Sequence, residues 1–177
     1  MKTFEENLKS IPTAEKTVLL RLYNQRDELV SIIPNIPGRQ GSVRVFKHIA
    51  EKKGAIDFEA AKEGLRIFEE KVEDARKNPG KHQKLELLLG MKSSGIIRIE
   101  NVECSCPDLL ENLSGQVASA EECKVFIELL NQGKIRAAEK VNNNWVPQSY
   151  VIDGVLNYFG THESERMDGK YWDKIPL

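Results

Sequence analysis

The first hundred residues divide into stretches with the two-residue repeat of strands and stretches with the repeat of helices. Apolar runs over 17–23 and 29–33, separated by a short polar break, predict a β-hairpin. Beyond it, apolar residues recur at helical spacing, and Ser42 and Asp57 are residue types that cap helices. The elements predicted here are an amphipathic segment over 4–8, the two strands, helices over 42–50, 57–77 and 85–89, and a strand over 96–99.

The last sixty residues open with a strong helix signal. Ser119 and Glu122 have the spacing of a capping box, in which the hydroxyl and the carboxylate each bind an exposed backbone amide. This helix is predicted to end at Gly133, before a strand over 134–141 and an asparagine turn over 142–144. Pro147 suits the first turn of a second helix. That helix is predicted to carry Tyr150, Val151, Val155, Leu156 and Phe159, and the tail over 169–177 to be extended.

Composition and charge indicate that the chain divides into two parts. Of the 177 residues, 40% are hydrophobic and 30% charged, which is typical of a globular protein. Residues 1–103 carry 19 Lys and Arg against 16 Asp and Glu, whereas residues 104–177 carry 7 against 11. We therefore predict an α+β protein of two small units: an α+β domain over 1–103, a linker over 104–116, and a helix-strand-helix module over 117–177.

The overall charge argues against several classes of protein. A formal net charge of −1 lacks the positive surface of a general nucleic-acid binder. No apolar run approaches the length of a membrane span, and the N-terminus lacks the pattern of a secretory signal. We expect a cytoplasmic protein that binds neither nucleic acid nor membrane. The odd set Cys104, Cys106 and Cys123 has no metal-site spacing, so no metal and no cofactor is expected.

Two similar phrases, Pro37–Ser42 and Pro79–His82, each pair a turn with basic residues before a predicted helix. Exposed amides at a helix start favour anions, so Arg39, Lys81 and His82 could line one basic cleft. The alternative is that both phrases are solvated turns. No motif of a nucleophile with its base is present, so no catalytic residue is predicted. A small enzyme using this cleft remains one hypothesis.

A second basic group is predicted on the strand over 134–141. Alternation places Arg136 and Lys140 on one face, as an exposed edge for an anionic ligand or a partner. Glu139 falls on the other face, where a buried carboxylate needs a hydrogen-bond donor or a cation as its partner. Trp145 and Trp172 could stack on a ligand, but we expect them to pack in the core.

The segment over 129–146 carries a phrase with a wider resemblance. Three segments carry it: Leu129 to Lys140, Asn144-Trp145-Val146, and Tyr171-Trp172-Asp173-Lys174-Ile175-Pro176. Together they resemble the N-terminal domain of tetrahydrodipicolinate N-succinyltransferase, an enzyme of the diaminopimelate route to lysine. The similarity covers about residues 117–177. In that family the last phrase leads into a hexapeptide-repeat β-helix that binds acyl-CoA. This chain ends at Leu177, and the family's paired lysines are replaced by Val151-Ile152-Asp153-Gly154, so we expect no succinyl transfer.

Residues 1–103 resemble a small bacterial domain family of unknown function. The similarity lies in Phe4-x-x-Asn7-Leu8, Pro37-Gly38-x-x-Gly41-Ser42, Gly64-Leu65 and Asn78-Pro79-Gly80-Lys81-His82.

Together the two resemblances favour a non-catalytic accessory protein. It would bind a small ligand, or bind a protein partner or a second copy through the C-terminal module, with Tyr171 and Trp172 as contacts. The alternative is an inactive or complementing partner of the succinyltransferase in lysine biosynthesis.

Overall fold

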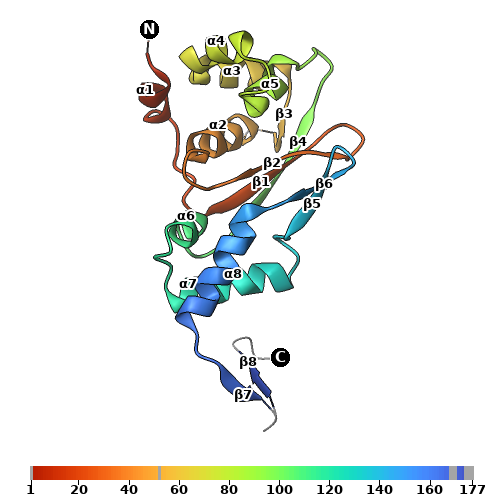
Figure 1. Ribbon diagram of the computed structural model, residues 1–177. Coiled ribbons are helices and arrows are strands. Elements are labelled where there is room, and N and C mark those ends of the chain that lie inside the picture. The colour runs from red at the N-terminus through yellow and green to blue at the C-terminus, as the bar shows by residue number, and fades with distance from the viewer. Residues whose placement is uncertain (1, 52, 168–170, 174–177) are drawn as a thin grey trace.

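A four-stranded antiparallel sheet forms the centre of the computed structural model, which describes residues 2–51, 53–167 and 171–173, and side chains as far as Ser164. The strand order is β2-β1-β4-β3. Its members are β1 (Thr17–Tyr23), β2 (Leu29–Pro34), β3 (Ala55–Ile56) and β4 (Ile97–Glu103). β1 and β2 form the predicted hairpin, whereas β4 reaches β1 from about 80 residues further along the chain (Figure 1). The protein is an α+β fold, as predicted.

Five helices cover one face of this sheet (Figure 1). They are α1 (Phe4–Leu8), α2 (Gln40–Ala50), α3 (Phe58–Phe68), α4 (Glu70–Lys77) and α5 (Gln83–Leu89). Leu20, Leu22 and Ile33 point from the sheet into this layer and pack with Phe46 and Leu88. This packing makes a hydrophobic core from residues 4–97 alone.

The second face of the sheet is covered by elements from residues 109–161 (Figure 1). Its elements are α6 (Leu109–Ser114), α7 (Ala120–Asn131), β5 (Ala138–Val141), β6 (Asn144–Pro147) and α8 (Ser149–Thr161). Leu19 and Ile32 pack here against Phe126 and Tyr150. β7 (Glu165–Met167) and β8 (Tyr171–Asp173) pair with each other. The sheet therefore has a core on each face, because successive strand residues point to opposite sides.

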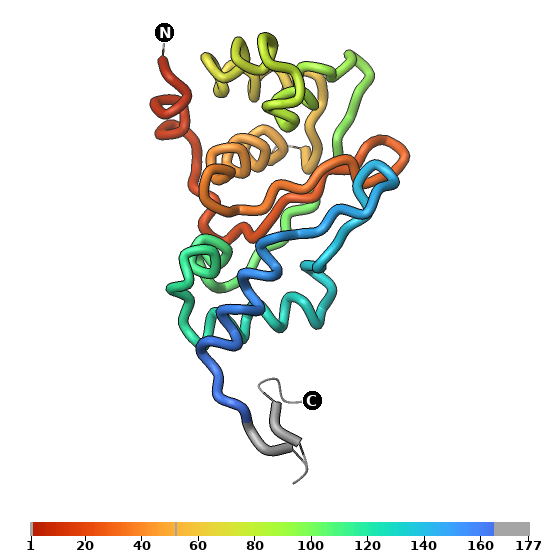
Figure 2. The backbone as a smooth tube through the Cα atoms, viewed as in Figure 1, coloured from red at the N-terminus to blue at the C-terminus, as the bar shows by residue number. Residues whose placement is uncertain are grey.

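The β5–β6 hairpin lies beside the β1–β2 hairpin, although more than 100 residues separate them. Figure 2 shows the two loops next to each other. The backbone amide of Asn142 donates to the carbonyl of Leu29 at 2.9 Å, which joins the hairpins directly. This contact fixes the second layer against the edge strand β2.

A buried ion pair joins the same two layers. Glu139 accepts hydrogen bonds from Nε of Arg21 at 2.9 Å and from Nη2 at 2.5 Å, and Arg21 also contacts Glu100. Arg21 is only 5% exposed. Arg21 is therefore the cation that Glu139 was expected to need.

Two predicted caps are confirmed. Ser119 accepts from the amide of Glu122, and the Glu122 carboxylate accepts from the amide of Ser119 at 2.8 Å. Asp57 accepts from the amide of Ala60 at 2.9 Å and so caps α3. α2 differs, because it begins at Gln40 with Arg39 at the N-cap position rather than Ser42.

Three boundaries were wrong. The helix predicted over 57–77 is broken at Glu69, whose φ of 43° separates α3 from α4. The strand predicted over 134–141 begins only at Ala138, so Arg136 precedes it. Pro147 ends β6, and α8 begins at Ser149. In each case tertiary packing or a turn overrides a locally consistent pattern.

The apolar face predicted for the last helix was also partly wrong. Tyr150 and Val151 are buried, but Leu156 is 55% exposed and Phe159 lies at the surface. Trp145 is 72% exposed on β6, instead of packing in the core.

The segment predicted as a linker, 104–116, contains α6, whose leucines at 109, 110 and 113 are buried in the second core. Within the described residues, no helix is long and apolar enough to cross a membrane.

Candidate functional site

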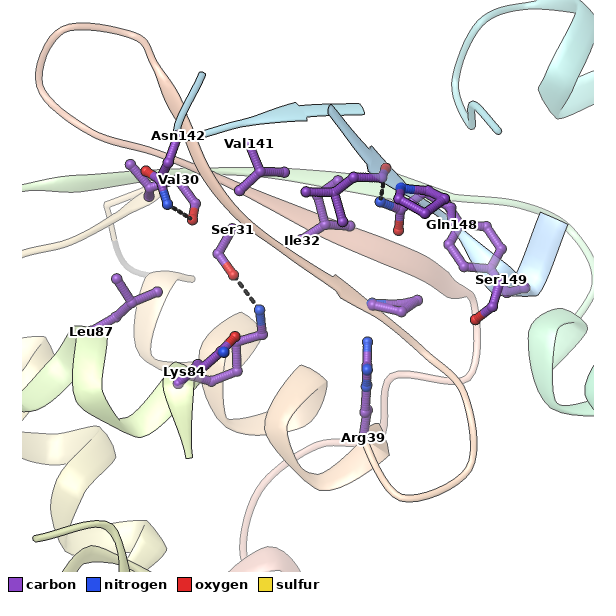
Figure 3. Close-up of a pocket in the computed structure, with 15 residues that line it drawn as sticks. Val30, Ser31, Ile32, Arg39, Lys84, Leu87, Val141, Asn142, Gln148 and Ser149 are labelled. Carbon is purple, nitrogen blue, oxygen red and sulfur yellow. Dashed lines mark hydrogen bonds between the residues drawn. The ribbon is translucent and has the colours of Figure 1, made fainter. Parts of the chain in front are cut away.

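Two adjoining cavities open between β2 and α5, and the larger one extends to the start of α8. The larger has a volume of about 500 Å³ and the smaller about 300 Å³. Arg39, Gln83 and Lys84 line both, so the two cavities form one hollow, which we call the Arg39–Lys84 cleft. Figure 3 shows the larger part, where Arg39 and Lys84 point toward β2.

Arg39 is placed by a tight turn in front of α2. Its amide donates to the carbonyl of Ile36 at 2.9 Å, and Gly38 between them has a φ of 80°, a conformation that favours glycine. As the N-cap residue, Arg39 accepts through its carbonyl from the amide of Val43 at 3.1 Å. Its exposed side chain forms no salt bridge within the described part of the chain. The turn thus holds a guanidinium with unused donors over the cleft.

Lys84 lies in the first turn of α5, on the wall opposite β2. Its ammonium group donates to the hydroxyl of the buried Ser31 (Figure 3). Burial, together with the positive charge of Arg39, lowers the pKa of Lys84 from 10.5 to about 8. No described carboxylate forms a salt bridge with it. A lysine with this combination of burial and a like charge is typical of functional sites.

Lys81 and His82 complete the basic lining in the smaller cavity. Both contact one carboxylate oxygen of Asp74, Lys81 through Nζ at 2.8 Å and His82 through Nε2 at 2.5 Å. The hydrogen bond from Lys81 and, to a smaller extent, the one from His82 hold the pKa of Asp74 well below its usual range. The Gly80 amide donates to Glu86, which fixes the loop. The structure thus brings Arg39, Lys81 and His82 to one cavity, although Lys81 and His82 are already paired.

Residues of the second layer form the remaining wall of the larger cavity. The Asn142 side chain donates to the carbonyl of Val30 at 3.3 Å, and the backbone amide of Gln148 donates to the carbonyl of Ala137 at 2.8 Å. Gln148 is the N-cap of α8 but makes no side-chain cap bond, so the first amides of α8 add a partial positive charge beside the cleft.

The charge balance decides what this cleft can hold. Its lining contains Arg39, Lys81, His82 and Lys84 but no aspartate or glutamate among the described residues. Arg39 and Lys84 form no salt bridge with a described acidic residue. An anion with one or two carboxylate or phosphate groups is the complementary ligand.

The other predicted site residues lie elsewhere. Arg136 and Lys140 are both exposed, but Arg136 precedes the strand, so the shared strand face predicted for them does not exist. Neither lines the cleft. Tyr171 and Trp172 are in β8, and their side chains lie outside the described part of the structure.

The three thiols do not form a metal site with other residues. Among the described residues, no group of three or more His, Cys, Asp or Glu side chains could hold a metal ion. Burial raises the pKa of the Cys104 thiol, which donates to the carbonyl of Cys106.

Lys84 is the site residue that sequence reasoning missed. It lies three and four residues before Leu87 and Leu88, so it shares the inward face of a short helix. The signal available in the sequence was one charged residue, Lys84, among the apolar positions of that helix face. Its partners Ser31 and Arg39 are 53 and 45 residues away, which only the fold reveals.

We expect Lys84→Met to stabilise the protein at neutral pH. The pKa of Lys84 is lowered on folding from 10.5 to about 8, so below pH 8 the folded state bears the full cost of a desolvated charge. That cost disappears as pH rises from 8 to 10.5, where the unfolded chain binds more protons. Allowing for the lost bond to Ser31, the gain at pH 7 is about 1–2 kcal/mol.

Thermal unfolding at pH 7 and pH 10 measures this effect. Lys124→Met, which removes an exposed lysine of α7, is the control and should change little at either pH. An equal gain from Lys84→Met at both pH values would contradict the desolvation of Lys84.

The fold and the cleft define an α+β protein with a site suited to a small anion. Residues 4–102 match the family described as "Uncharacterized protein conserved in bacteria (DUF2322)". That match spans more than half of the chain, and the chain belongs to this family. The resemblance predicted for residues 1–103 is confirmed.

The similarity to succinyltransferases is also confirmed, as a partial one. The 2,3,4,5-tetrahydropyridine-2,6-dicarboxylate N-succinyltransferase of Buchnera aphidicola subsp. Schizaphis graminum is 43% identical over 54 residues, which are 29% of this chain and 20% of that enzyme. The Alteromonas mediterranea enzyme is 41% identical over the same shares. That of Serratia proteamaculans is 31% identical over 67 residues, 36% of this chain and 24% of the enzyme. The chain thus spans about a fifth to a quarter of these relatives. No solved structure matches it.

Proposed function

We propose that this protein is a non-catalytic cytoplasmic binding protein for a small dicarboxylate, held in the Arg39–Lys84 cleft. The observation that carries the proposal is the pair of cations without an acidic partner on a lining without carboxylates. In this proposal, residues 1–103 supply the cations, and residues 117–177, the succinyltransferase-like module, close the cleft from the other side.

Energetics favour an anionic ligand there. Desolvating Lys84 beside Arg39 costs stability, and a bound carboxylate offsets that cost by supplying the missing opposite charge. A volume of about 500 Å³ is within the range of small-molecule sites. Arg39 offers parallel N–H donors that match the two oxygens of a carboxylate.

Two lines of support favour a dicarboxylate over a single carboxylate. The basic side chains are spread over two cavities, with Lys81 and His82 in the smaller one and Arg39 and Lys84 in both. The succinyltransferases that match part of this chain are named for acting on a dicarboxylate.

Calorimetric titration with succinate and glutarate tests the proposal. We expect saturable binding that weakens with added salt, and no comparable binding of propionate or succinamide. Arg39→Ala and Lys84→Ala should each weaken binding by about tenfold or more, because each removes a charged hydrogen-bond donor. Lys124→Ala removes the same charge outside the cleft and should leave binding unchanged. Binding that survives both cleft substitutions, or no binding of either dicarboxylate, would overturn the proposal.

A further inference from the structure

Lys84 differs from the other basic side chains of the cleft in its hydrogen-bond partner. Lys81 and His82 are held by the carboxylate of Asp74, and the guanidinium of Arg39 acts only as a hydrogen-bond donor. Lys84 instead donates to a neutral hydroxyl, that of Ser31, and has Val30 and Leu87 as further neighbours in the lining. Figure 3 shows its amine directed at Ser31 across the cavity. Its amine can therefore lose a proton without breaking an ion pair.

The surroundings of Lys84 increase the share of nucleophilic amine. Burial and the charge of Arg39 bring its pKa to about 8, so about a tenth of the amines are neutral at pH 7. An ordinary lysine with a pKa of 10.5 has about three in ten thousand. A lysine desolvated beside a second cation is one of the ways in which proteins activate an amine.

We propose that Lys84 captures a small 2-oxo acid as a reversible Schiff base, with the acid's carboxylate bound by Arg39. The inference rests on the proposed function, because it uses the same anion site and names the ligand class more closely. Two neighbouring groups with different chemistry, a nucleophilic amine and a guanidinium, match the adjacent carbonyl and carboxylate of a 2-oxo acid.

The step balances without an oxidant or a reductant. The Nζ lone pair forms a bond to the carbonyl carbon while the carbonyl π electrons move to its oxygen, and one of the two Nζ protons is transferred to that oxygen, which becomes a hydroxyl. The nitrogen lone pair then forms the C=N bond as the C–O bond breaks, and the hydroxyl takes the second Nζ proton and leaves as water. The Ser31 hydroxyl already accepts a hydrogen bond from Nζ, so it can relay a proton from Nζ to the oxygen of the 2-oxo group.

Borohydride trapping of the full chain tests the inference. The protein is incubated with 2-oxoglutarate, reduced, and examined by intact mass and by peptide mapping. We expect one adduct, at Lys84. Lys84→Arg, which keeps the charge, should abolish it, and Arg39→Gln should lower its yield by about tenfold or more through loss of the carboxylate contact. Lys124→Arg should leave the yield unchanged, and acetone, which lacks a carboxylate, should give little adduct.

The outcomes separate this inference from the function on which it rests. If 2-oxoglutarate binds in calorimetry and no adduct forms, or if adducts are spread evenly over the exposed lysines, the Schiff base is overturned and anion binding stands. If neither 2-oxoglutarate nor succinate binds and no adduct forms, both fall. Thermal unfolding of each variant confirms that a lost adduct does not reflect a lost fold.

Discussion

Gly154→Ala should lower the melting temperature by about 6–12 °C, because α8 packs on α7 at this glycine with no room for a side chain. A Cβ at position 154 would lie within 2.6 Å of Cε2 of Phe126, and closer still to two other atoms of the ring. Phe126 is fully buried, so the ring cannot move without displacing its neighbours. Overpacking of this kind costs about 3 kcal/mol, which corresponds to that shift in a chain of this size.

The same helix offers a matched control. Gly160 also lies in α8, and a Cβ there would meet no atom within 4 Å. Gly160→Ala should therefore be neutral or stabilise by up to about 1 kcal/mol, because alanine favours the helix. Phe126→Leu combined with Gly154→Ala should recover part of the loss. Equal melting temperatures for the two glycine variants would contradict the close packing of α7 and α8.

Glu139→Ala should destabilise the protein by about 3–5 kcal/mol. The substitution leaves the guanidinium of Arg21, 5% exposed, with only Glu100 and the Lys134 carbonyl as partners. Removing one member of a buried pair is costly because the other charge stays buried. Chemical denaturation measures the loss as a lower midpoint with an unchanged slope.

Two variants show whether the ion pair itself is responsible. Lys140→Ala changes an exposed residue next to Glu139 and should alter stability by no more than about 0.5 kcal/mol. Arg21→Met with Glu139→Leu removes both charges and should be more stable than Glu139→Ala alone. A double variant as unstable as the single one would show that lost packing, not the buried charge of Arg21, dominates.

Local signals predicted the parts of the fold that depend on near neighbours. The Ser119–Glu122 capping box and the β1–β2 hairpin depend on residues a few positions apart, so the sequence contains their whole cause. Glu69 shows the opposite case: the apolar spacing continues through it, and no local signal predicts its positive φ. Leu156 is a similar case. The helical pattern shows which residues share the apolar face of α8, but it does not show how much of that face the neighbouring layer covers, and Leu156 lies outside the covered part.

The sequence alone predicted only part of the candidate site, namely the basic residues of the two turns. The two turn phrases place Arg39 and His82 at helix starts, but whether the two turns share a cleft depends on the packing of α2 and α5, which the structure supplies. The opposite wall comes from Asn142 and Gln148, over 100 residues from Arg39, and reaches the cleft through the hydrogen bond between Asn142 and Leu29. No local rule predicts that contact.

The place of β4 beside β1 has a consequence for biosynthesis. β1 is complete at Tyr23, but its partner on that side ends only at Glu103. At ribosomal rates of about 5–20 residues per second, β1 waits about 4–16 s after synthesis for this neighbour. During that interval its residues that face the second layer, such as Leu19, lack the elements beyond residue 108 that later bury them. Chaperones that bind extended apolar segments therefore have time to engage this strand on the nascent chain.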